Sequence, residues 1–240
     1  MADMPQKRSY QRRTPYNNKN RQMKNETLSS DTKVFALGGL NEVGKNMYCI
    51  EHQDELVIID AGVKFAEDGL PGIDYVIPDY TYLKRNQKKI KALLITHGHE
   101  DHIGGIPFLL QVVHIPFIYA SPLACAMIRR KLEEKRLTQA TKLIQINNLS
   151  QVKTKYFNIG FFKTNHSIPE SLGIVINTPN GRIVSTGDFK FDLTPVGDPA
   201  DFQVMSFLGE TGVTLLLSDS TNAEVPNFSI SEKQVAYSVQ

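Results

Sequence analysis

The chain has 240 residues, of which 41% are apolar and 22% charged, so it is long enough to bury a sizeable core in one or two domains. Its two cysteines, Cys49 and Cys125, stand far apart in apolar surroundings, which argues against a disulfide framework and predicts buried free thiols in a reducing compartment. No run approaches the ~18 apolar residues of a membrane span, and the opening residues lack the apolar stretch of a secretory signal. We therefore expect a cytoplasmic protein.

The first 30 residues differ in charge from the rest of the chain. Residues 1–30 carry seven Lys or Arg against Asp3 and Glu26, a surplus of +5, so the net charge of +2 for the whole chain leaves −3 for the remainder. This stretch has almost no large aliphatic residue, and we predict a disordered basic tail. Such a tail can bind a polyanion such as RNA, although a merely solvated tail is an equally good interpretation.

Ordered structure is predicted to begin near Lys33. Three short apolar runs, "KVFALGGL", "NMYCIEH" and "ELVIIDAG", are separated by turn residues and predict three strands that pair as hairpins. The segment "PDYTYLKRNQKKIK" has a helical pattern with five positive charges between Lys84 and Lys91. These charges are expected on a solvated helix face rather than on a phosphate-binding surface.

The middle of the chain alternates strands and helices. "ALLIT" is wholly apolar, which indicates a strand buried on both faces, and it is followed by a polar loop, a helix in "IPFLLQVV" and a strand in "IPFIYA". "SPLACAMIRRKLEEKRL" predicts a helix with Ser121 as N-cap, Pro122 at its first position and a core-facing stripe at positions 123, 127, 128 and 132. Further short strands follow, with "PNGR" as a hairpin turn, and no internal repeat is present.

The polar loop between strand and helix, "ITHGHEDHIGG" at residues 95–105, holds three of the six histidines. Neutral imidazoles and carboxylates that converge on an ion are the usual ligands of a catalytic metal, and loops at the carboxyl ends of strands are where such folds build their sites. His97 and His99 can share one ion while Asp101 and His102 turn towards a second. We favour this interpretation over scattered surface histidines, and we leave Glu100 out of the ligand set because its neighbours point the other way.

Two later strand ends supply further ligand candidates. His166 in "KTNHSIPES" and Asp188 in "IVSTGDFKFD" each follow an apolar strand, and with the cluster they complete a set of four His and two Asp. Asp60, at the end of "LVIID", is predicted to orient a ligand imidazole. His52 and His114 have no comparable context and are interpreted as structural.

These residues resemble a known family. The pattern H-x-H-x-D-H after an apolar strand, with a later His and a later strand-end Asp, is similar to the metallo-β-lactamase superfamily. Longer segments resemble the bacterial ribonuclease J family, of its β-CASP nuclease branch, over about residues 33–235. They are "ALGGLNEVGKNMY", "IIDAGVKFAEDGLPGIDYVIPD", "THGHEDHIGGIPFLL", "NHSIPESLGIVINTPNGRIVSTGDFKFD" and "LLLSDSTNAEVP".

The resemblance implies roles for the residues that match. His97, His99 and His166 would hold one Zn²⁺, Asp101 and His102 the other, and Asp188 would bridge both; Mn²⁺ would also suit these ligands. Asp101, Asp188 and His102 would be the catalytic residues, because they would hold the ions and position the hydroxide formed between them. That hydroxide would attack the phosphodiester.

The resemblance also implies a substrate and partners. It implies 5′-to-3′ exonucleolytic degradation of single-stranded RNA, with a preference for a 5′-monophosphate end, plus endonucleolytic cuts, in RNA maturation and decay. A homo-oligomer, or a complex with a paralogue or other RNA-decay proteins, is implied for the full-length protein.

The implied fold is an α/β protein with the αββα sandwich of the superfamily, incomplete in this chain. We expect a metallo-β-lactamase domain over 31–222 and the start of a β-CASP domain over 223–240, with a further metal-ligand histidine beyond it. The fragment would then be inactive alone. Two alternatives stay open: a small-molecule hydrolase of the same superfamily, such as a thioesterase, and a non-catalytic RNA-binding or scaffold subunit of an RNA-decay assembly. RNA cleavage that is lost on replacing His97 and His99 would separate these hypotheses.

Overall fold

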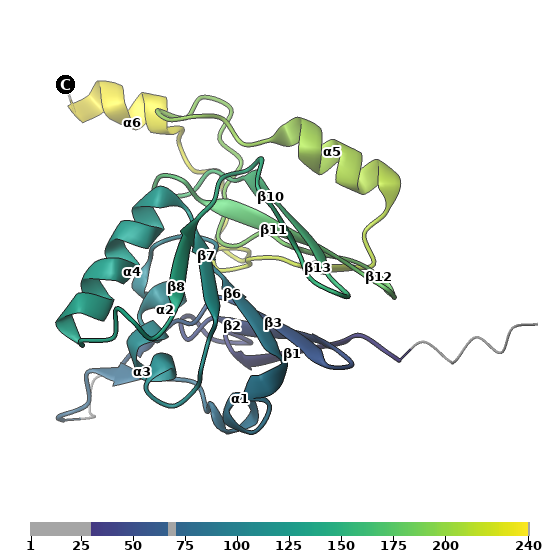
Figure 1. The fold of residues 1–240 in the computed structure, drawn as a ribbon. Coiled ribbons are helices and arrows are strands. Elements are labelled where there is room, and N and C mark those ends of the chain that lie inside the picture. The colour runs from purple at the N-terminus through teal and green to yellow at the C-terminus, as the bar shows by residue number, and fades with distance from the viewer. Residues whose placement is uncertain (1–29, 67–70, 240) are drawn as a thin grey trace, which may run out of the picture.

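The structure, a computed structural model, describes residues 30–66 and 71–239 as two β-sheets packed face to face, with helices on both outer faces (Figure 1). The first sheet has the order β1 (Lys33–Gly38), β2 (Met47–His52), β3 (Glu55–Ile59), β6 (Ile90–Leu94), β7 (Phe117–Ala120) and β8 (Lys142–Gln145). The second has the order β13 (Leu215–Leu217), β12 (Gly181–Ser185), β11 (Leu172–Thr178), β10 (Asn158–Lys163) and β9 (Gln151–Lys153). The predicted αββα arrangement is confirmed.

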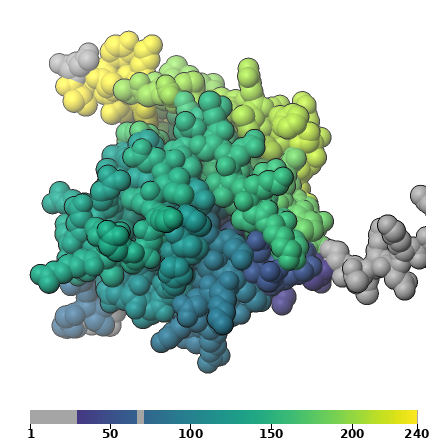
Figure 2. All heavy atoms as spheres, in the orientation of Figure 1, coloured from purple at the N-terminus to yellow at the C-terminus, as the bar shows by residue number. Residues whose placement is uncertain are grey.

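Helices cover the outer faces of the two sheets. Those on the first sheet are α1 (Thr81–Arg85), a 3-10 turn (Gln87–Lys89), α2 (Glu100–Ile103), α3 (Ile106–Leu110) and α4 (Pro122–Glu134). On the second sheet lies α5 (Phe202–Thr211), and α6 (Glu232–Val239) stands at one corner of the molecule (Figures 1 and 2). A small ribbon of β4 (Lys64–Phe65) and β5 (Tyr75–Val76) completes the described elements.

Strand alternation explains why both sheets are buried. In β3, Leu56 and Ile58 pack against the helices of the first sheet, whereas Val57 and Ile59 join Ile159 and Ile174 in the layer between the sheets. All five residues of β3 are buried, which is the pattern of a strand covered on both faces. The core therefore has one layer between the sheets and one layer under the helices on each side.

The strand directions bring several strand ends to one edge of the sandwich. β3 and β6 run parallel, so Asp60 and His97 follow neighbouring strands at the same end of the first sheet. The chain leaves β10 before His166 and β12 before Asp188, and these turns belong to the second sheet. The candidate ligands thus lie where the two sheets meet.

Several sequence-based expectations hold. The first three strands pair as antiparallel hairpins, "PNGR" forms the turn between β11 and β12, and both cysteines are buried free thiols. Within the described residues no helix is both long and apolar enough to cross a bilayer.

Other expectations are corrected. The buried strand spans Ile90–Leu94 rather than residues 92–96, and the helix predicted over 78–91 is only the short α1 and a 3-10 turn. The histidine loop contains the one-turn helix α2. The buried stripe of α4 is centred on positions 124, 125, 128 and 132, because position 123 faces partly outward. The predicted tail lies outside the described residues except for Ser30, and the domain boundary near residue 222 stays a prediction.

Candidate metal centre

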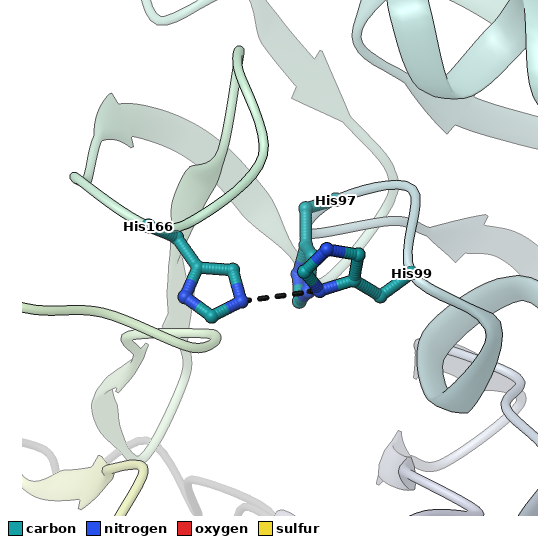
Figure 3. A group of neighbouring side chains, drawn as sticks. All are labelled: His97, His99 and His166. Carbon is teal, nitrogen blue, oxygen red and sulfur yellow. Dashed lines mark hydrogen bonds between the residues drawn. The ribbon is translucent and has the colours of Figure 1, made fainter. Parts of the chain in front are cut away.

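The six predicted ligands converge on one small volume at the junction of the sheets. Four of them come from the loop and one-turn helix after β6, and two come from turns of the second sheet. Figure 3 shows His166 on one side and His97 and His99 on the other, with their side chains pointing toward one another. Residues 69 positions apart in the sequence are therefore brought together by the packing of the two sheets.

Three imidazoles form the first half of the site. The Nδ1 atom of His99 lies 3.1 Å from Nε2 of His97 and 3.1 Å from Nε2 of His166 (Figure 3). The ligand atoms of the three residues all lie within 4.8 Å of one another. Three nitrogen atoms at this spacing can surround a single ion at ~2.0–2.1 Å from each.

A second half is formed around Asp188 and His102. Asp188 Oδ1 lies 3.3 Å from His102 Nε2, whereas Oδ2 lies 3.6 Å from His166 Nε2 and 4.0 Å from His97 Nε2. The two oxygens of one carboxylate thus face different imidazole groups. This is the arrangement that a carboxylate bridging two ions requires.

Asp101 stands beside the second half of the site. Its Oδ2 atom lies 3.4 Å from His102 Nε2 and accepts a hydrogen bond of 3.3 Å from the Asn46 amide. Asp101 and His102 are consecutive residues of α2, and their side chains nevertheless come within reach of the same ion.

Thr96 and Asp60 orient two of the candidate ligand rings. The Thr96 hydroxyl donates to Asp60 Oδ2 at 2.8 Å, so its oxygen accepts from Nδ1 of His97 at 3.0 Å. His102 donates its Nδ1 proton to the same carboxylate at 2.8 Å. In His97 this leaves the lone pair on Nε2, facing the cluster, whereas in His102 the bond to Asp60 turns Nε2 towards Asp101 and Asp188. The expectation that Asp60 orients a ligand imidazole agrees with this geometry.

The pKa shifts in the cluster separate two kinds of environment. Burial, with the neighbouring histidines, pushes the pKa of His97 far below its usual range, and burial also lowers the pKa of His166. Burial opposes protonation of His102 as well, but the carboxylates of Asp60, Asp101 and Asp188 raise its pKa well above the ordinary value. Burial would raise the pKa of Asp101, yet its hydrogen bond with His102 lowers it.

These environments fit a divalent cation. His97 and His166 are neutral near pH 7, which is the form in which imidazole binds a metal. Three carboxylates surround the second half, so a positive charge there is favoured, whether a proton on His102 or a metal ion. Imidazole and carboxylate ligands together suit Zn²⁺ and Mn²⁺.

Residues 61–63, just after β3, support the ligand loop at residues 95–105. Sequence reasoning did not identify them as part of the site. The amides of Ala61 and Val63 donate to the carbonyls of His102 and Glu100, at 2.8 and 3.1 Å. At Gly62 a Cβ atom would lie only 1.6 Å from the carbonyl oxygen of Asp101. Gly62 is the glycine that ends "IIDAG", and it was the available sequence signal.

Asn46 is a second residue that sequence reasoning missed. Its backbone amide and its side-chain amide both donate to the carbonyl of Asp101, at 3.1 and 3.2 Å, and the side chain also reaches Asp101 Oδ2. Asn46 therefore holds both the backbone and the carboxylate of a candidate ligand.

The residues left out of the ligand set lie elsewhere. Glu100 forms an ion pair with Lys131 of α4 and faces away from the cluster. His52 is buried beside Thr32, with Nδ1 3.0 Å from its hydroxyl, and His114 is exposed. Their interpretation as structural residues is consistent with these positions.

Comparisons with known proteins agree with the fold. A family model described as the metallo-beta-lactamase superfamily matches residues 40–234. The chain is 61% identical over 210 residues to Ribonuclease J 1 of Streptococcus pyogenes serotype M3. The aligned region covers 88% of this chain and 37% of that protein. It is 49% identical over 204 residues to Ribonuclease J of Mycoplasma pneumoniae, and this aligned region covers 85% of the chain and 36% of that protein.

A solved structure shows the same fold without close sequence similarity. A protein of unknown function from Enterococcus faecalis V583 matches with a TM-score of 0.67 at 15% identity, over 88% of this chain and 56% of that chain. The chain spans less than two fifths of the length of the two curated relatives. The match over residues 40–234, with the αββα fold, shows that the chain belongs to the metallo-beta-lactamase superfamily.

Proposed function

We propose that this chain is the metal-binding part of a ribonuclease that hydrolyses phosphodiester bonds in RNA. The observation that supports the proposal most is the convergence of His97, His99 and His166 on one side of Asp188 and of His102 on the other. The identity of 61% to a ribonuclease J points to RNA as the substrate. The finer proposal is 5′-to-3′ exonuclease activity with endonucleolytic cuts and a preference for a 5′-monophosphate end.

The ligands would divide between two ions as their positions suggest. His97, His99 and His166 would hold one ion, Asp101 and His102 the other, and Asp188 would bridge them, with Zn²⁺ as the first choice for this set. Bound ions of this kind lower the pKa of a water and neutralise charge on the phosphate. Asp188 and Asp101 would accept hydrogen bonds from the attacking water, while Asp60 and Thr96 keep the rings of His102 and His97 oriented.

Cleavage of RNA by paired variants tests the proposal. A 5′-monophosphorylated, 3′-labelled oligoribonucleotide is incubated with the full-length protein, with the His97→Ala/His99→Ala variant and with His114→Ala. The double variant should lose at least about 10³-fold in activity because it removes two of three ligands of one ion, while His114→Ala, an exposed position, retains it. RNA binding without cleavage in the unaltered protein would instead favour the scaffold alternative.

The ligand assignment has a separate test in metal content. His166→Ala should lower the bound metal per chain as well as activity, because its Nε2 is one of three nitrogens around the first ion. Metal is measured by plasma mass spectrometry after dialysis, with His52→Ala as a histidine control outside the cluster. An unchanged stoichiometry in His166→Ala would refute the assignment.

A further inference from the structure

A cavity of about 880 Å³ lies beside the metal centre and shares His166 with it. Another lining residue, Ile168, is next to the ligand loop, since a Cβ atom built on Gly98 would lie 3.4 Å from its Cδ1. The cavity therefore adjoins the place where the candidate ligands converge. Its size is in the range of pockets that hold small organic groups.

Much of the wall is aliphatic, and one side of it is α6. Ile146, Leu172, Val196, Ile230 and Val235 line the cavity. Val196 and Ile230 are 71% and 63% exposed, so a ligand that covered them would remove apolar surface from water. The start of α6 is held in place because Glu232 pairs with Lys190 at 2.6 Å and accepts from the Val196 amide at 2.9 Å.

The charged groups in the wall are already paired. Lys163 bonds Asp198 at 2.6 Å, Lys190 pairs with Glu232, and Glu170 accepts from the Leu123 amide at 2.7 Å. A bare anion would have to compete with these carboxylates for the lysines. The cavity is therefore better suited to an uncharged group than to a phosphate.

Two buried hydroxyls in the wall have no hydrogen-bond partner within the described part of the chain. They belong to Ser121 and Thr164, which are 3% and 7% exposed. Ser121 occupies the N-cap position of α4 but makes no capping bond, because Glu170 accepts from the helix instead. Buried hydroxyls without a partner are uncommon, so both are candidates to bond a polar group of a ligand in the cavity.

We propose that this cavity receives one nucleobase of the RNA strand, next to the phosphate at the metal centre, with Ser121 and Thr164 bonding its polar edge. A base has two apolar faces, no charge and a rim of donors and acceptors, which matches aliphatic walls, paired charges and two spare hydroxyls. The inference rests on the proposed function, since it requires RNA to be the substrate.

The test compares intact RNA with RNA that lacks one base. The substrates are 3′-labelled oligoribonucleotides with a single abasic residue at successive positions around the scissile bond. At one position the abasic residue should raise the KM of the full-length protein about tenfold, the loss expected for one base contact. Ala236→Trp, which places an indole in the cavity wall, should raise the KM for intact RNA and abolish that difference between substrates.

Two further variants make the result specific. Ser238→Trp lies on the same helix outside the cavity wall and should keep the full abasic effect. Thr164→Val keeps the shape of the side chain but removes the hydroxyl, so KM should rise about fivefold without a lower melting temperature. A merely structural threonine would change the melting temperature and leave KM as it was.

The outcomes separate the two proposals. Efficient RNA cleavage with no sensitive abasic position, or with an abasic effect that survives Ala236→Trp, would overturn the base cavity and leave the ribonuclease intact. Absence of RNA cleavage and binding by the unaltered protein would overturn both. An Ala236→Trp variant that loses stability while the abasic effect persists would mean that a segment of protein fills the cavity instead.

Discussion

Single backbone positions decide whether the ligand loop can form. Asp60 has a φ of +59°, a conformation that costs an L-residue ~1–2 kcal/mol, and it is held by the Thr96 amide, the Thr96 hydroxyl and the His102 ring. Two residues later, Gly62 lies in contact with the carbonyl of Asp101. A residue with a strained backbone, Asp60, and a glycine, Gly62, thus lie close together next to the candidate metal ligands.

We predict that Gly62→Ala reduces metal binding and stability. A methyl group at position 62 overlaps the Asp101 carbonyl, so the ligand loop must shift, and core overpacking of this kind costs ~1–3 kcal/mol or more. Urea unfolding and metal content report the two effects. Gly160→Ala is the matched control, because no atom of the described residues lies within 4 Å of a Cβ atom there. Equal behaviour of the two variants would contradict the supporting role of Gly62.

Charged side chains also fix the packing of elements. Lys89 and Lys91, from the basic run interpreted as a solvated face, pair with Glu51 of β2 and Glu55 of β3 at 2.7 and 4.0 Å. Glu51 is buried and also accepts from the Tyr82 hydroxyl of α1. Burial would raise the pKa of Glu51, but the bonds from Lys89 and Tyr82 lower it below its ordinary value of 4.5.

The stabilisation from Glu51 should depend on pH. Since the folded pKa lies below the unfolded one, the contribution is present above about pH 4.5 and is lost as the pH falls through the folded pKa. Glu51→Gln should lower the free energy of unfolding by ~1–2 kcal/mol at pH 7, and the difference should shrink towards pH 3. Glu134→Gln, in an exposed ion pair with Arg130, should change it by less than ~0.5 kcal/mol. A pH-independent Glu51 effect would contradict this account.

At the scale of the molecule, the candidate metal centre connects the two sheets. His97, His99, Asp101 and His102 follow β6 of the first sheet, whereas His166 and Asp188 follow β10 and β12 of the second. The apolar layer between the sheets already holds them together. Bound ions would add a cross-link at the edge, so the stability of the sandwich should depend on metal.

Removal of metal should therefore lower the melting temperature. A ligand at 100 times its Kd stabilises the folded state by ~2.7 kcal/mol, which corresponds to roughly 5–10 °C for a protein of this size. Calorimetry with and without a chelator measures the shift, and added Zn²⁺ should restore it. The His97→Ala/His99→Ala variant should show a much smaller shift. A shift of equal size in that variant would place the stabilising metal elsewhere.

The sequence by itself determined the local features whose signals are contiguous. The apolar runs located most strands, Pro122 located the start of α4, and the spacing of His97, His99, Asp101 and His102 indicated a metal site before any fold was known. It also separated Glu100 and His114 from the ligands. These features depend on neighbours within a few positions, which a sequence shows directly.

Only the tertiary structure decided what depends on residues distant in sequence. The bridging orientation of Asp188 and the bonds of Asn46 to Asp101 arise from the packing of separate segments. The close approach at Gly62 has the same origin. Ser121 shows the difference most clearly: its local pattern predicts a helix cap, but Glu170, 47 positions from the capped Leu123, accepts the hydrogen bond. Among residues 30–66 and 71–239 the Ser121 hydroxyl has no hydrogen-bond partner, because long-range packing, not local preference, sets which acceptor is nearest to the helix.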